Sequence, residues 1–203
     1  MSSSHDSRSS AGTQLGADAL LQAGLAASQS NDPERALELF AQASAASPAS
    51  GVPHFLAGSE YAALGRLDRA EAELAKAVLL APSFHIARYQ LGLLQFSAGR
   101  AATALVTWEP LFELDDAQAL GHFVCGFAAL AQDDFDGAKS HFEVGLARNN
   151  ENPALSADIG KVLLGIEQAQ TQHSGSGSQA TPQNAQAAEH VLVSNYGRYG
   201  TLH

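Results

Sequence analysis

Residues 51–84 read GVPHFLAGSEYAALGRLDRAEAELAKAVLLAPSF, and the spacing within this stretch recurs along most of the chain. Small residues at fixed places in a period of 34 are typical of stacked helix hairpins, because two helices cross closely only where one side chain is small. Three columns of residues share this interval: Gly24, Gly58, Gly92 and Gly126; Ala36, Ala70, Ala104 and Ala138; and Phe40, Leu74, Trp108 and Phe142. The sequence therefore predicts an all-α array of helix hairpins.

The second period also carries a more specific pattern, formed by Gly58, Tyr61, Gly65, Ala70, Leu74, Ala77 and Pro82. This pattern resembles the tetratricopeptide repeat. The third period matches it at Leu91, Gly92, Gly99, Ala104 and Trp108, and the fourth at Gly126, Ala138 and Phe142. The resemblance implies a right-handed solenoid of four helix-turn-helix units.

The expected organisation of the chain follows from this register. We expect a polar, disordered tail at 1–14 and four repeats within 15–152, at about 17–50, 51–84, 85–118 and 119–152. An apolar helix at 153–170 would cap the last repeat, because the final core face of a solenoid needs a cover. A flexible linker at 171–183 and a short helix with a tail at 184–203 would complete the chain.

Two residues depart from the repeat pattern. Pro110 falls inside the second helix of the third repeat, where it removes a backbone hydrogen bond and should kink the helix or end it early. Gly145 replaces the alanine that is usual at its position in the fourth repeat. Neither residue changes the period of 34, so the predicted fold stands.

The composition excludes several classes of function. The 203 residues carry a net charge of −10 with only 11 Lys and Arg, which disfavours binding to nucleic acid. Cys125 is the single cysteine, so no intramolecular disulfide forms. The sequence shows neither an apolar leader nor an apolar run long enough to span a membrane. These features predict a cytoplasmic location.

One face of the first helix of each repeat is unusually apolar. In the tetratricopeptide family this face lines a concave groove, so the resemblance implies a site for a peptide with apolar anchors. The alternative is that the same side chains pack between adjacent repeats. The predicted groove residues are Phe55, Ser59, Tyr89, Leu93, Phe96, Phe123, Phe127 and Leu130.

No other site emerges from the sequence. The groove positions hold no Lys or Arg, which argues against the clamp with which some family members grip a C-terminal carboxylate. His54 and His122 stand two repeats apart, too far to share a metal ion, and are expected to pack between helices. Residues 132–143 partly match a calcium loop, but the register needs them as a turn and a helix. We expect no metal, no cofactor and no catalytic residues.

The leading hypothesis is a non-catalytic chaperone or adaptor that holds an apolar segment of a partner protein in the groove. In size, charge and groove chemistry the chain is similar to the tetratricopeptide chaperones of bacterial secretion systems. The alternative is an assembly scaffold, either a homo-oligomer or part of a secretion or envelope machine. In a further variant of these hypotheses, the C-terminal tail docks in the chain's own groove.

Overall fold

A computed structural model describes residues 6–115 and 118–175, and the side chains of 16–115 and 118–171. This part of the chain contains nine α-helices and no strand, which confirms the predicted all-α fold. The helices are α1 (Asp6–Gln29), α2 (Pro33–Ala46), α3 (Val52–Ala63), α4 (Leu67–Leu80), α5 (His85–Ser97), α6 (Ala101–Phe112), α7 (Ala119–Leu130), α8 (Phe135–Arg148) and α9 (Pro153–Gly175).

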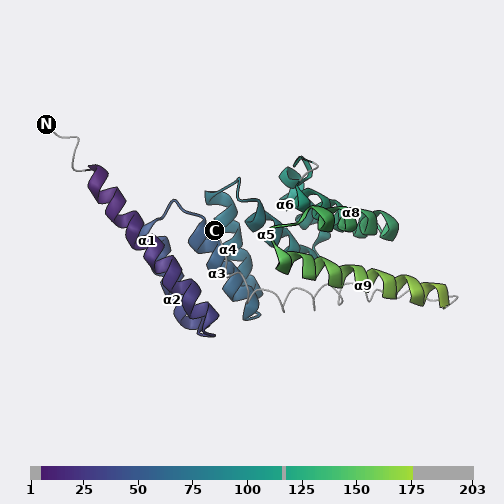
Figure 1. The fold of residues 1–203 in the computed structure, drawn as a ribbon, viewed down its shortest axis with the longest axis horizontal. Helices are drawn as coiled ribbons and strands as arrows, with labels where there is room; N and C mark the ends of the chain where they lie inside the picture. Colours follow the sequence, from purple (N-terminus) through teal and green to yellow (C-terminus); the bar gives the residue numbers. More distant parts are fainter. Residues whose placement is uncertain (1–5, 116–117, 176–203) are drawn as a thin grey trace. The chain divides into compact units, whose positions relative to one another are not determined.

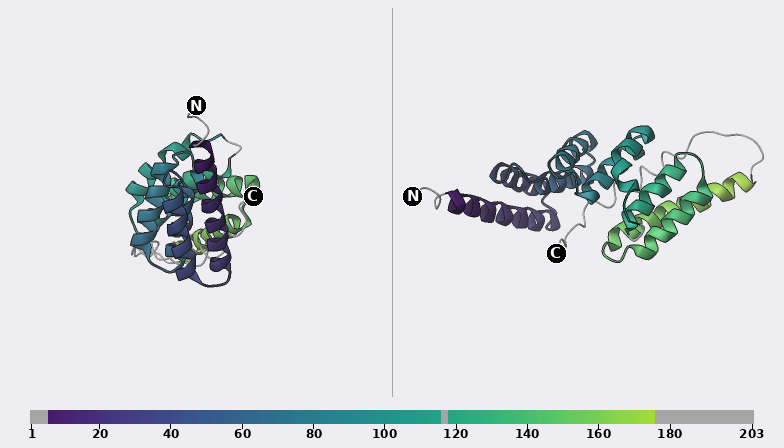
Figure 2. Two further views of the ribbon diagram at one scale, coloured as in Figure 1. Left: turned by 90° about the vertical axis from the view of Figure 1, so that its left-hand side faces the viewer. Right: turned by 90° about the horizontal axis from the view of Figure 1, so that it is seen from above.

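The helices divide between two compact units, one ending at Ala87 and the other beginning at Arg88, so that α5 starts in the first and continues in the second. In the first unit α1 packs on α2, α2 on α3 and α3 on α4 (Figure 1). In the second unit α6 packs on α7, α7 on α8 and α8 on α9. The right-hand view of Figure 2 shows α9, in yellow-green, beside α8. Within each unit these consecutive helices are thus neighbours, as in a tetratricopeptide solenoid.

The glycine column of the sequence marks the places where two helices of one hairpin meet most closely. A Cβ on Gly24 would lie 2.5 Å from a ring carbon of Phe40, and one on Gly126 equally close to the ring of Phe142. Gly58 faces Leu74 at 2.8 Å, and Gly92 faces the indole of Trp108. Each bulky residue in the period therefore fills the space that its glycine leaves open, which explains why the two columns occur together.

A second column forms the turns within the hairpins. Asn31, Gly65, Gly99 and Asp133 stand 34 residues apart, and all four have a positive φ, between 57° and 74°. After each of them the next backbone N–H reaches back to a carbonyl in the preceding helix, as when Arg66 donates to Tyr61 at 2.8 Å. This geometry ends a helix with a left-handed residue, for which Gly, Asn and Asp are the most tolerant types.

Helix α6 confirms the expectation for Pro110. The helix ends at Phe112, two residues after the proline, and has 12 residues where α4 and α8 have 14. Proline lacks an N–H for the carbonyl one turn earlier, so the helix loses a bond there and stops.

Two boundaries differ from the sequence prediction. Helix α1 begins at Asp6, so residues 6–14 are helical and the predicted disordered tail is wrong there. Helix α9 continues to Gly175, into the stretch predicted as a linker. Both extensions lack a proline, and a helix already begun adds residues at little cost. The rest of the linker, and the short helix and tail predicted at 184–203, lie outside the described residues.

Candidate functional site

The side chains predicted to line a groove fall into two groups. Five of the eight are buried, with 4% or less of their surface exposed: Phe55, Ser59, Tyr89, Phe123 and Phe127. The other three, Leu93, Phe96 and Leu130, are half-buried, and all belong to the second unit. We call these three the apolar rim. Phe96 and Leu130 occupy the same position in adjacent repeats, and Leu93 precedes Phe96 by about one helical turn.

The apolar rim borders a cluster of buried aromatic rings in the second unit. The ring of Phe96 lies 5.3 Å from that of Phe127, and Phe127 lies 5.5 Å from Trp108, measured between ring centroids. Trp108 also donates a hydrogen bond from Nε1 to the carbonyl oxygen of Tyr89, at 3.0 Å. Rings at these separations attract one another and fix each other's positions, so Phe96 extends outward from a rigid base.

Gly145 leaves space for the buried ring of Phe123. A Cβ at position 145 would lie 2.5 Å from a ring carbon of Phe123, whereas the same position in the first two repeats carries Ala43 and Ala77. The missing methyl group gives the Phe123 ring room to lie against α8. The glycine at position 145, where the repeat usually has alanine, therefore adjusts the packing of α8 against α7.

In the first unit the predicted groove positions are occupied by internal contacts. Phe55 packs against Phe84, with 4.8 Å between ring centroids. Ser59 donates its hydroxyl hydrogen to the carbonyl of Phe55, at 3.0 Å.

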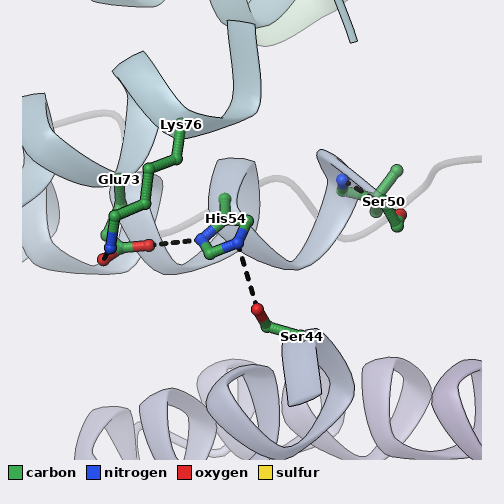
Figure 3. Close-up of polar contacts among 6 residues, drawn as sticks. Ser44, Ser50, His54, Glu73 and Lys76 are labelled. Carbon is green, nitrogen blue, oxygen red and sulfur yellow. Dashed lines mark hydrogen bonds and ion pairs between the residues drawn. The ribbon is translucent and has the colours of Figure 1, made fainter. Parts of the chain in front are cut away.

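His54 is the centre of a polar network that joins three helices of the first unit (Figure 3). Its Nδ1 lies 2.6 Å from Oε2 of Glu73 on α4, and its Nε2 lies 3.0 Å from Oγ of Ser44 on α2. Lys76 donates to the other oxygen of Glu73, at 2.8 Å. Partial burial alone would raise the pKa of Glu73, but the hydrogen bonds from Lys76 and His54 outweigh it, so the pKa is lowered.

This network was not predicted from the sequence, although the pair of positions that forms it recurs at a fixed spacing in the repeats. His54 and Glu73 are 19 residues apart, as are Arg88 and Thr107 in the third repeat and His122 and His141 in the fourth. Arg88 donates to the carbonyl oxygen of Thr107 at 3.3 Å, and the rings of His122 and His141 lie 6.2 Å apart. The same pair of positions thus joins the two helices of each of these hairpins.

The order Ser44, His54 and Glu73 invites comparison with a hydrolytic triad. A triad also needs free backbone N–H groups that bind the developing oxyanion. Ser44 lies inside α2, where the helix itself uses these groups. The network is better explained as a link between the first two hairpins.

The remaining candidates also have structural explanations. Burial raises the pKa of Cys125, which keeps its sulfur in the less reactive thiol form. In the segment that partly matches a calcium loop, Asp134 caps α8 by accepting a hydrogen bond from the backbone N–H of Gly137, at 2.9 Å. Among the described residues, no group of three or more His, Cys, Asp or Glu is arranged to hold a metal ion.

Comparison with known proteins assigns the repeats. Residues 20–95 match the family profile described as tetratricopeptide repeat. This stretch therefore carries tetratricopeptide repeats, and the fold of the chain is that of a tetratricopeptide solenoid. This repeat is a non-catalytic protein-interaction fold. No curated protein sequence matches the chain, and no helix in the described ranges is long and apolar enough to cross a membrane.

Solved structures show the same fold at low sequence identity. Pseudomonas aeruginosa PilF matches with a TM-score of 0.61 and 18% identity, over 95% of this chain and 79% of PilF. MamA from Desulfovibrio magneticus RS-1 matches with a TM-score of 0.58 and 17% identity, over 87% of this chain and 93% of MamA. YrrB, described as a tetratricopeptide repeat protein with an unusual peptide-binding site, matches with a TM-score of 0.52 and 16% identity, over 88% and 87% of the two chains.

Proposed function

We propose that this protein binds an apolar segment of a partner protein at the rim formed by Leu93, Phe96 and Leu130. The observation that carries the proposal is that these three large apolar side chains stay half-exposed while the other five predicted groove residues are buried. Partly exposed apolar side chains on a rigid base gain free energy when a partner covers them, and little is lost in ordering them.

The wider role that we propose is that of a cytoplasmic chaperone or adaptor, which keeps an apolar segment of its partner away from water. Repeats of this kind are binding scaffolds, and their surface residues choose the partner. YrrB, which shares the fold, is described as having a peptide-binding site. This description supports a peptide as the occupant that we propose.

A pull-down with the full chain tests the proposal. The rim variant, Leu93→Glu with Leu130→Glu, would put two charges where the partner's apolar side chains should pack. The matched control is Val106→Glu with Leu164→Glu, because both are large apolar residues of the second unit that lie away from the rim and are exposed by 72% and 58%. Circular dichroism would check that all variants keep their helices.

We expect the wild-type chain and the control to recover the same partner, identified by mass spectrometry, and the rim variant to lose it. Equal recovery by all three would contradict binding at the rim. Recovery of nothing but further copies of the chain, whether or not the rim is intact, would favour the assembly scaffold.

A further inference from the structure

The second unit has an uneven distribution of charge that bears on the partner. Between Arg100 and Lys139 the chain contains no Lys or Arg, which leaves α6, α7 and their turns without a permanent cation. The same stretch contains seven acidic residues: Glu109, Glu113, Asp115, Asp116, Asp133, Asp134 and Asp136. This stretch of the chain is therefore strongly negative.

Three of these acids lie next to the rim. Leu130 is the last residue of α7, and its carbonyl accepts a hydrogen bond from the backbone N–H of Asp133, at 3.1 Å. The side chains of Asp133, Asp134 and Asp136 are exposed. The C-terminal end of α7 adds partial negative charge at the same place, and its last turn carries no basic residue.

The hydrogen bonds of these carboxylates come from neutral groups. Asp134 accepts from the backbone N–H of Gly137, and Asp136 accepts from Nε2 of Gln170, at 3.2 Å. The negative charge beside Leu130 is thus held in place by the fold without being cancelled in these two contacts.

From this arrangement we infer that the segment bound at the apolar rim carries Lys or Arg beside its apolar anchors, with the cationic side chains facing the Asp133–Asp136 turn. The inference rests on the proposed function, since the rim provides the apolar contacts. The turn after Phe96 carries Arg100 in place of an acid, so the attraction is directed to the Leu130 end of the rim. Complementary charge of this kind selects partners and sets their orientation.

The test uses two fluorescein-labelled peptides and the full chain in a buffer with EDTA. One peptide has the sequence LKKLLKLLKKLLKL, and the other has Gln in place of every Lys. Dissociation constants are measured by fluorescence anisotropy for the wild type, for the rim variant, and for the turn variant Asp133→Asn with Asp134→Asn and Asp136→Asn. Asparagine tolerates the φ of 57° at position 133 and still caps a helix at position 134.

A matched control removes the same amount of charge elsewhere. Asp32→Asn with Glu34→Gln and Glu38→Gln neutralises three acids at the equivalent turn of the first hairpin, and an asparagine at position 32 would still cap α2. Both triple variants have the same net charge, so they differ in the position of the lost charges and in the ion pairs of Glu34 with Arg66 and of Glu38 with Arg35, which only the control breaks.

We expect the Lys peptide to bind the wild type about tenfold more tightly than the Gln peptide, and the turn variant to lose about that factor for the Lys peptide alone. The control should bind both peptides as the wild type does. Equal affinity of the two peptides, or equal losses in the two triple variants, would overturn the inference. If the rim variant binds the Gln peptide unchanged, or if the wild type binds neither peptide, the proposed function fails as well.

Discussion

Replacing Gly126 with alanine tests the packing principle of the whole array. The new Cβ would lie 2.5, 2.6 and 2.8 Å from three ring carbons of Phe142. Phe142 is fully buried and its ring meets that of Phe127 edge-on, so it has no free direction in which to move. Overpacking of a core costs about 1–3 kcal/mol, and three close contacts argue for the upper end. Alanine regains about 1 kcal/mol through its helix propensity. The expected net loss is therefore about 2 kcal/mol.

The assay is thermal and urea unfolding followed by far-ultraviolet circular dichroism. In a chain of this size a loss of about 2 kcal/mol lowers the melting temperature by about 4–8 °C. Gly160→Ala in α9 is the matched control, because nothing lies within 4 Å of the position where its Cβ would be. The control should gain about 1 kcal/mol, so the two substitutions are expected to act with opposite signs. A Gly126→Ala protein as stable as the wild type would refute the claim that Phe142 fills the space above this glycine.

Two further substitutions probe single interactions. Trp108→Phe removes the buried hydrogen bond to the Tyr89 carbonyl and some ring volume. It should lower the free energy of unfolding by about 1–3 kcal/mol, measured by urea unfolding. An unchanged urea midpoint would show that the bond adds nothing to stability. The pKa of Glu73 is lowered in the folded protein, so its carboxylate stabilises the fold when the pH is above 4.5, the ordinary pKa of this group. This contribution is lost as the pH falls below 4.5. Glu73→Gln should therefore destabilise the protein at about pH 7 and have little effect at about pH 3, whereas a loss independent of pH would contradict this.

The sequence aligned the predicted groove residues by repeat position, but it did not give the exposure of each one. Phe96 and Leu130 hold the same repeat position and both remain half-buried, while Phe123 is fully covered. Phe123 belongs to another repeat position, and Phe55 and Tyr89 at that position are buried as well, so burial here follows the position of the side chain between the packed helices. Gly145 on α8 gives the Phe123 ring room, and this matters only once the two helices are placed together. Similarly, the 19-residue spacing of His54 and Glu73 is visible in the chain, but the link to Ser44 depends on the packing of α2 against α3.

By itself the sequence determined the features that depend on the local chain. The period of 34 defines the hairpins, the glycine column allows the close crossings, and residues that tolerate a left-handed backbone recur at every hairpin turn. These features are local because each depends on the size or backbone freedom of one residue. Tertiary structure alone decided which apolar side chains are covered. The burial of a side chain is a sum over neighbours that are mostly distant in sequence, and only the packed helices bring those neighbours together.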